Sequence, residues 1–269
     1  MRAKSAGAEL EYSVEGDGDE TVLLIMGLGA RAADWATAFP SALAKRYRVV
    51  RFDNRGVGRS SRIQPGASLS DLAGDAVAVL DAVGAARAHV IGISMGGMIA
   101  QLMALEHASR VDKLVLMSTH VGGPTVERPL PEAQALLDPA ALMASAADPE
   151  AMRRRVIRVI TAPGFCEREP ALVDELVEVS RREPTHPMAF IAQFQAIIAS
   201  DRSARVHAIA APTLVIHGSE DTLIPPANGR MLAEKIPGAR YVELASCGHM
   251  PMHEQPAALT KTVQDFLAR

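Results

Sequence analysis

The stretch at residues 88–107 constrains the fold most, because its hydrophobic pattern changes period at Ser94. Before this serine, residues 90–93 form a short apolar run with β-branched side chains, which is typical of a strand buried on both faces. After it, apolar residues recur at helical spacing as far as Leu105. The GxSxG pattern at 92–96 is a nucleophile elbow, which needs glycines because its strained turn packs against neighbouring backbone. We expect the Ser94 hydroxyl above a strand end, beside the positive end of a helix.

Short apolar strands alternate with amphipathic helices on both sides of this elbow. The patterns predict strands at 10–14, 21–26, 47–53, 111–118, 212–217 and 240–244, and helices at 34–45, 70–83, 228–235 and 256–267. Such alternation implies right-handed crossovers and a mainly parallel sheet, whose ligands bind beyond the carboxyl ends of the strands. The chain is therefore predicted to have an α/β fold with its site at that edge.

The alternation stops between residues 119 and 211. A proline-rich loop at 122–131 is followed by helical patterns at 136–146, 149–160, 170–182 and 187–200. A helical insertion between two strands of the sheet is the natural interpretation. We predict a core domain formed by 1–118 and 212–269, with 119–211 as a helical cap over the active edge.

Two polar residues downstream of the elbow can act together with the serine. Asp221 follows the strand at 212–217, and His249 follows the strand at 240–244. A serine hydroxyl is a poor nucleophile near neutral pH, so it needs a base within hydrogen-bond reach and a carboxylate that orients the base. The three strand-end positions predict a catalytic triad of Ser94, Asp221 and His249.

Each partner also has a plainer interpretation. Asp221 alone reads as a cap for the turn at 222–226, and His253 and His217 are rival bases. The place of His217 within a strand favours a core residue. Neither histidine pair predicts a zinc site, because no third ligand follows at a metal-binding spacing.

With these residues together, the sequence resembles the α/β-hydrolase superfamily over its full length apart from the insertion. The matching motifs are 27–29 (Gly-Leu-Gly), 53–60, 92–96, 218–221 and Gly248-His249. Within the superfamily the chain is similar to helical-capped serine esterases and lactonases, including enol-lactone hydrolases and antibiotic methylesterases. The resemblance implies a mostly parallel eight-stranded sheet flanked by helices.

The resemblance also implies an oxyanion hole made by the backbone amides of Leu28 and Met95, which would stabilise the negative oxygen of a tetrahedral intermediate. Many relatives have a histidine before the loop glycine, where this chain has Met26. A thioether hardly accepts a hydrogen bond, so we expect the loop geometry to depend more on packing. Asp53 and Arg55 are expected to organise the turn that contains them.

Apolar residues of the cap and of the active edge are candidates for the substrate pocket, although core packing is an equally good interpretation of each one. These candidates are Met98, Met143, Phe165, Met188, Phe190, Phe194, Leu223 and Met250.

Composition and charge exclude several function classes. The formal net charge of −3 and the Glu-rich surroundings of the arginines at 153–155 and 181–182 give no case for nucleic-acid binding. Two distant cysteines, Cys166 and Cys247, suggest reduced thiols, with a single disulfide as the alternative. We find no signal-peptide pattern at the start and no apolar run near the ~18 residues of a membrane span. We therefore expect a cytoplasmic protein that acts on a small molecule without metal or cofactor; the sequence is silent on oligomeric state.

Two other functions compete with hydrolysis. Residues 27–32 fit the GxGxxA form of the dinucleotide fingerprint, and Asp53 closes the next strand. That fingerprint needs a helix that begins at the glycines, whereas the pattern here indicates a start near residue 34. A ligand-binding protein without turnover is the other alternative, since fold does not fix function.

We predict a carboxylic ester hydrolase that acts through an acyl-enzyme on small to medium apolar esters. An enol-type lactonase, a carbon–carbon bond hydrolase or a perhydrolase with the same triad are the alternatives. Relatives that dehalogenate or open epoxides use an aspartate nucleophile, so Ser94 disfavours both.

Overall fold

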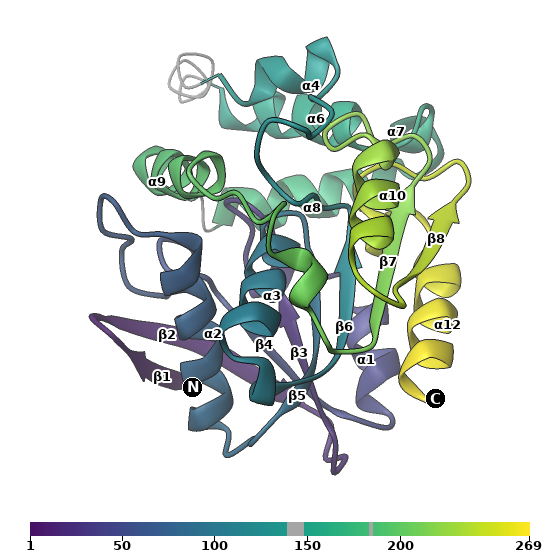
Figure 1. Cartoon of the computed structure of the whole chain (residues 1–269). Helices are drawn as coiled ribbons and strands as arrows, with labels where there is room; N and C mark the ends of the chain where they lie inside the picture. Colours follow the sequence, from purple (N-terminus) through teal and green to yellow (C-terminus); the bar gives the residue numbers. More distant parts are fainter. Residues whose placement is uncertain (139–147, 183–184) are drawn as a thin grey trace.

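A twisted eight-stranded sheet forms the centre of the fold (Figure 1). The computed structural model describes residues 1–138, 148–182 and 185–269. The strand order is β1-β2-β4-β3-β5-β6-β7-β8; β2 pairs antiparallel with β1 and β4, and all other pairs are parallel. The predicted mostly parallel sheet is confirmed. Its strands are β1 (Arg2–Ser5), β2 (Ala8–Glu15), β3 (Thr21–Ile25), β4 (Arg48–Phe52), β5 (Ala88–Ile93), β6 (Val111–Met117), β7 (Thr213–Gly218) and β8 (Arg240–Leu244).

Helices cover both faces of the sheet. One face carries α2 (Leu69–Ala82), α3 (Met95–Glu106) and α10 (Pro226–Lys235), and the other carries α1 (Ala38–Ala44) and α12 (Pro256–Leu267).

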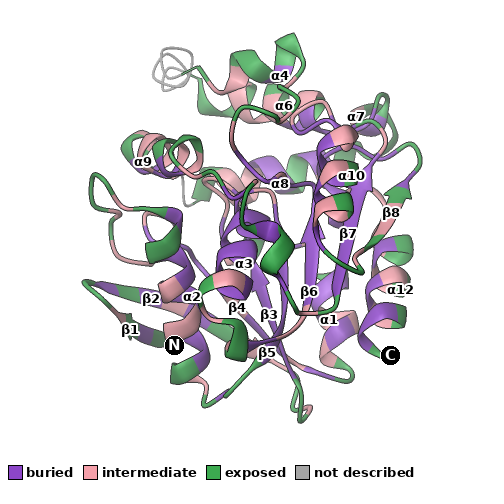
Figure 2. Ribbon diagram, viewed as in Figure 1, coloured by how far each residue is buried: buried purple, intermediate pink, exposed green. Residues whose placement is uncertain are grey.

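Successive residues of the central strands enter opposite cores, because side chains alternate along a strand. Leu23 and Val90 pack on the α2 and α3 side, whereas Leu24 and Ile91 pack on the α1 and α12 side. The central strands are buried throughout (Figure 2), which explains why they read as apolar runs.

The helix predicted at 70–83 is α2, and the sequence encodes both its ends. The Ser68 hydroxyl accepts the Asp71 amide at 3.2 Å, and the Asp71 carboxylate accepts the Ser68 amide at 2.8 Å. This capping box is worth about 1 kcal/mol. Gly84, at φ +68°, ends the helix in the left-handed region that favours glycine.

The segment between β6 and β7 lies over the carboxyl ends of the strands, at the top of Figure 1. Within its described part it contains helices and no strand. Its helices are α4 (Pro131–Leu136), α6 (Pro149–Ile160), α7 (Phe165–Arg168), α8 (Pro170–Arg182) and α9 (Pro187–Ile198), followed by the 3-10 helix η4 (Val206–Ala208). We call this segment the cap, and we retain the boundaries 1–118, 119–211 and 212–269 as a proposal.

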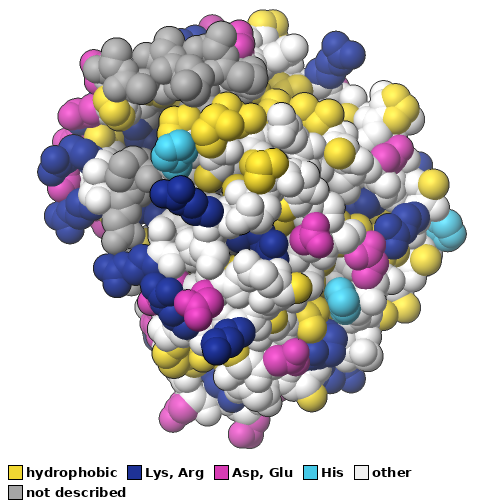
Figure 3. All heavy atoms as spheres, turned by 90° about the vertical axis from the view of Figure 1, so that its left-hand side faces the viewer, with side chains coloured by type: hydrophobic (Ala, Val, Ile, Leu, Met, Phe, Trp, Pro, Cys, Tyr) yellow, Lys and Arg dark blue, Asp and Glu magenta, His cyan; other side chains and the backbone are white. Residues whose placement is uncertain are grey.

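Three further short helices connect the larger elements: η1 (Ala32–Asp34), η2 (Ala108–Arg110) and α11 (Pro251–Glu254). No helix in the described ranges is long and apolar enough to cross a membrane. Acidic and basic side chains are interspersed on the face drawn in Figure 3. Both cysteines, Cys166 and Cys247, are free.

Candidate active site

The serine of the elbow lies between β5 and α3 in a strained conformation. Ser94 has φ 56° and ψ −123°, which places a non-glycine residue at positive φ. A Cβ on Gly92 would lie 2.2 Å from the Gly96 carbonyl oxygen, and a Cβ on Gly96 would lie 2.1 Å from that of Ile25. Both positions therefore require glycine, as the sequence pattern predicts. The strain fixes Ser94 at the N-terminus of α3, where the helix dipole favours negative charge.

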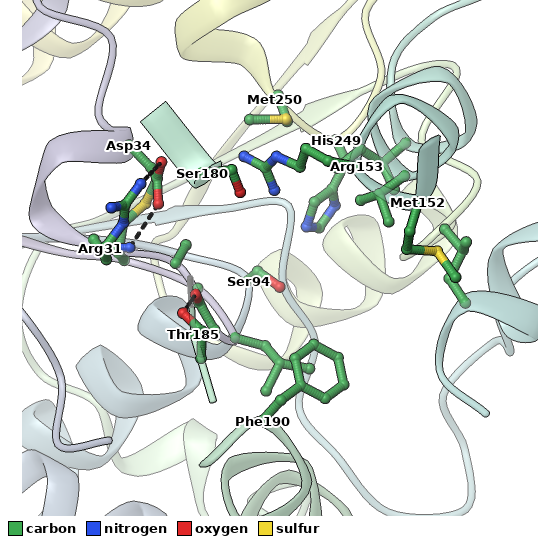
Figure 4. Close-up of a pocket in the computed structure, with 18 of the residues that line it drawn as sticks. Arg31, Asp34, Ser94, Met152, Arg153, Ser180, Thr185, Phe190, His249 and Met250 are labelled. Carbon is green, nitrogen blue, oxygen red and sulfur yellow. Dashed lines mark hydrogen bonds and ion pairs between the residues drawn. The ribbon is translucent and has the colours of Figure 1, made fainter. Parts of the chain in front are cut away.

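The predicted acid and base are in direct contact. His249 Nδ1 lies 2.8 Å from Asp221 Oδ2, and both side chains are buried. The other carboxylate oxygen of Asp221 accepts the amides of Leu223 and Ile224 at 3.0 and 2.9 Å. Both interpretations of Asp221 therefore apply, because one oxygen caps a turn and the other orients the imidazole. Ser94 and His249 line one cavity, shown in Figure 4.

A second histidine also contacts this carboxylate. The Nε2 of the fully buried His217 lies 3.3 Å from Asp221 Oδ2 and 2.7 Å from the Ile224 carbonyl oxygen. The carbonyl can only accept, so Nε2 carries the proton. Burial raises the pKa of Asp221, but the charge of His249 and hydrogen bonds from both histidines outweigh it and hold that pKa well below its ordinary value. Asp221 therefore stays ionised.

Neither of the two rival bases predicted from the sequence, His217 and His253, lines the cavity that contains Ser94. His217 is a core residue of β7, as its place in a strand indicated. Its contact with Asp221 was not predicted from the sequence. His253 Nε2 lies 3.0 Å from the Asp34 carbonyl oxygen, and this ring does not line the cavity.

The loop that carries His249 is fastened to the cap. The Glu254 carboxylate accepts the amides of Gly248 and Met250 at 2.9 and 3.1 Å and the cap amide of Ala162 at 2.7 Å. The His249 amide donates to the Ile160 carbonyl oxygen at 2.7 Å, at the end of α6. Sequence patterns gave no signal for Glu254, because its partners are backbone groups of two segments.

The backbone segments that carry the two amides expected in the oxyanion hole lie beside the serine. Met95 begins α3, and the first amides of a helix have no acceptor within the helix. Leu28 lines the cavity with Ser94, and a Cβ added to Gly27 would lie 3.2 Å from the Ser94 Cβ. Both backbone segments therefore approach the nucleophile closely.

Hydrogen bonds, as well as packing, brace the loop at 27–29. Gly29 donates its amide to Gln193 Oε1 at 2.8 Å, and its carbonyl oxygen accepts the Thr185 hydroxyl at 2.7 Å. Gln193 Nε2 also donates to the Arg55 carbonyl oxygen at 3.0 Å. The expectation that Met26 leaves the loop dependent on packing was incomplete, because side chains at the α9 end of the cap supply the support.

The cavity has a volume of about 410 Å³ and lies between the strand ends and the cap. Of the predicted pocket residues, Phe190, Leu223 and Met250 line it.

Four other candidates do not line this cavity, each for a different reason. Met98 packs in the core against the sheet, because α3 is buried on nearly all sides, and Phe165 packs in the small core of the cap. Met188 points to solvent, and Phe194 stacks against Phe190, the residue that does line the cavity, at a centroid distance of 6.5 Å. Met143 lies outside the described residues.

Comparison with known proteins identifies the family. The model of the alpha/beta hydrolase fold matches residues 20–256. The chain belongs to the α/β hydrolase family. It is therefore a hydrolase, as the resemblance implied.

Full-length relatives of this α/β hydrolase carry different names. The chain is 31% identical to "Putative carbamate hydrolase RutD" of Variovorax paradoxus, over 97% of this chain and 96% of the relative. It is 33% identical to a 2-hydroxy-6-oxononadienedioate/2-hydroxy-6-oxononatrienedioate hydrolase of Burkholderia vietnamiensis, over 98% and 93%. The crystal structure of an enol-lactonase from Burkholderia xenovorans superposes with a TM-score of 0.86 at 31% identity and covers 100% of both chains.

The structure of this hydrolase also bears on the dinucleotide interpretation. Asp53 accepts the amides of Ala32 and Arg59 at 2.8 and 3.2 Å, so its carboxylate organises the loops. The short η1 and then α1, beginning at Ala38, follow the glycines, in place of the helix that the fingerprint requires. Arg55 forms a buried ion pair with Asp75, a structural role. The described residues contain no group of three or more metal-ligating side chains.

Proposed function

We propose that this hydrolase cleaves carboxylic esters through an acyl-enzyme, with Ser94 as nucleophile, His249 as general base and acid, and Asp221 as the carboxylate that orients the base. The observation that carries the proposal is the 2.8 Å contact between His249 Nδ1 and Asp221 Oδ2, with Ser94 and His249 facing one cavity. A proton on Nδ1 leaves Nε2 free to accept the serine proton.

The reaction proceeds in two halves. Ser94 Oγ attacks the ester carbonyl carbon while His249 Nε2 takes the hydroxyl proton, and the oxyanion accepts hydrogen bonds from the Leu28 and Met95 amides. Each such donor is worth about 3 kcal/mol in the transition state. The intermediate collapses, the ester C–O bond breaks, and His249 returns the proton to the leaving alkoxide. Water repeats the sequence on the acyl-enzyme, which releases the acid and restores Ser94.

The ionised state of Asp221 supports this proton transfer. When His249 accepts the proton it becomes a cation beside a buried carboxylate, and the low pKa of Asp221 keeps that carboxylate negative. His217 Nε2, whose proton is donated to the Ile224 carbonyl oxygen, also lies 3.3 Å from the same carboxylate oxygen. The mechanism needs no metal and no cofactor.

Lactones are the second candidate substrates, because a lactone is a cyclic ester that reacts through the same steps. The full-length similarity to a structure described as an enol-lactonase favours them. Carbon–carbon bond hydrolysis uses a different leaving group, so its test adds 2-hydroxy-6-oxononadienedioate, the compound named for one relative, to the esters and lactones. We also propose a cytoplasmic location, which the two free cysteines support.

The experiment is hydrolysis of p-nitrophenyl esters and lactones of graded size by wild type and Ser94→Ala, with labelling by a fluorophosphonate probe. We expect turnover to fall by up to about 10⁶-fold in Ser94→Ala, because triad members act as a unit. Labelling should occur at Ser94 alone. The matched control is Ser70→Ala, an exposed serine on α2. Ester turnover by Ser94→Ala near the parent level would refute the proposal.

A further inference from the structure

One arginine of α6 lines the cavity, whereas the neighbouring arginines of this helix point to solvent. On α6, Arg154 and Arg158 are exposed and form ion pairs on the outer surface. Arg153 lines the cavity together with Ser94. Figure 4 shows its guanidinium extending toward Ser180, on the same side of the cavity as the His249 ring. The helix therefore places one positive charge inside the site.

Arg153 has no hydrogen-bond or ion-pair partner among the described residues. Its Nε atom is buried without an acceptor. The carboxylate of Asp34 binds Arg31 instead, through the Arg31 amide at 2.8 Å and the guanidinium at 3.4 Å. Arg181, which like Arg31 also lines the cavity, pairs with Glu178 at 2.8 Å. The neighbouring cations are thus paired within the protein, and Arg153 is not.

A half-buried guanidinium whose Nε has no acceptor is costly, because this N–H loses hydration and gains no hydrogen bond in return. Burial lowers the pKa of Arg153 from its ordinary value; Asp34 acts against this effect and Arg31 adds to it. An anion that enters the cavity removes this cost. The site is therefore preorganised for a negative group on the ligand.

We propose that Arg153 binds an anionic group of the substrate, so that the ester or lactone cleaved at Ser94 also carries a carboxylate. This inference rests on the proposed function. A guanidinium presents a planar pair of N–H donors that match the two oxygens of a carboxylate. Apolar side chains such as Val156 and Phe190 line the same cavity, which suits a hydrocarbon portion of the ligand.

The test compares pairs of esters in which one member carries a carboxylate and the other carries an uncharged group in its place. Mono-p-nitrophenyl glutarate is paired with p-nitrophenyl pentanoate for an anion in the acyl half, and 4-acetoxybenzoate is paired with its methyl ester for an anion in the alcohol half. In wild type we expect kcat/KM to favour the anionic member of at least one pair by about tenfold to 100-fold. Arg153→Met should reduce this ratio to about one.

Two further variants distinguish recognition from a general effect on the cap. Arg153→Lys keeps the charge but loses the planar fork, so its ratio should be intermediate. Arg155→Met removes the same charge from an exposed position on α6 and should leave the ratio at the wild-type value. No anion preference in wild type, or an equal fall for both members of each pair in Arg153→Met, would overturn the inference.

Binding separates failure of this inference from failure of the proposed function. Glutarate is titrated calorimetrically into Ser94→Ala with Arg153 intact and into the double variant Ser94→Ala, Arg153→Met. We expect the double variant to bind at least about tenfold more weakly. If no ester is cleaved but this difference is found, the anion site stands and the proposed function fails. Equal binding by the two variants overturns the anion site whatever the esters show.

Discussion

The strand ends and the cap contribute to one cavity in different ways. The strand ends carry Ser94, Asp221 and His249, each placed by a turn that directly follows a strand. The cap contributes apolar walls, the guanidinium of Arg153, which has no partner among the described residues, and the side chain of Gln193 that braces the glycine loop. In the proposed mechanism the core therefore determines which bond is broken, while the cap determines which substrates are accepted and how firmly the glycine loop is held.

The largest effect should come from the strand ends. In Asp221→Asn an amide NH₂ can replace the oxygen that accepts from His249 Nδ1, which favours the wrong tautomer of the ring. We expect kcat to fall by about 10⁴-fold for every substrate. The control is Glu220→Gln, an exposed neighbour on the same loop. A fall confined to one class of substrate would contradict a purely chemical role for the strand ends.

His120, at the junction between core and cap, should reduce the stability of the protein in acid. Burial, then the charges of Arg202, His217 and His249, lower the pKa of His120 to about 4. An unfolded histidine titrates near ~6.5, so the unfolded state binds the proton more readily and stability falls as pH drops from about 6.5 to about 4. His120→Asn should remove up to about 3 kcal/mol of this loss.

Urea unfolding at pH 7 and pH 4.5 measures this pH effect. Asparagine retains an oxygen acceptor for the Gly122 amide, which His120 Nδ1 accepts at 3.0 Å. The exposed His207 provides the matched control in His207→Asn. If the free energy of unfolding falls equally between pH 7 and pH 4.5 in wild type and in His120→Asn, protonation of His120 does not cause the loss.

The cap's support of the loop should have a moderate effect. Gln193→Leu leaves the Gly29 amide without its acceptor and the Arg55 carbonyl oxygen without its donor. We expect kcat to fall about tenfold with little change in KM, because the loop carries a donor used in the transition state. Gln195→Leu, at an exposed position on α9, is the control. A rise in KM at constant kcat would assign Gln193 to substrate binding instead.

The smallest effect should come from the outer surface of the cap. Arg158 and Glu167 form an ion pair in which both side chains are more than half exposed, at 65% and 58%. Solvent screens such pairs, so Arg158→Gln should leave the melting temperature and kcat/KM unchanged within error. A clear loss of activity would show that the outer face of the cap affects the site, contrary to the division drawn here.

Much of the fold follows from periodicity, and the exceptions have local causes. The long apolar strands and capped helices agree with their predicted positions within a few residues. The edge strand β1 was not predicted, because its four residues are mostly polar and bury only Ala3 strongly. The helix expected from residue 34 begins at Ala38, after the 3-10 turn of η1.

Some residues of the candidate site could likewise be predicted from the sequence, and others could not. Asp221 and His249 could be proposed because residues that follow parallel strands gather at one edge of a sheet. Gln193 and Gly29 are 164 residues apart, and no short motif links them. Arg153 looked like part of a solvated cluster, since only the packing of α6 decides which of three successive arginines turns inward.

The hydrogen bonds of Glu254 to the His249 loop and to the cap matter for any attempt to exchange caps between enzymes of this family. Two backbone groups of the cap help to position the loop that carries His249. The Ile160 carbonyl oxygen accepts the His249 amide, and the Ala162 amide donates to Glu254. A chimaera in which residues 160–162 were replaced together with the cap would lose both of these hydrogen bonds to the His249 loop. A transplant that begins after Ala162 and leaves Glu254 in place would alter selectivity while keeping the proton-transfer machinery aligned.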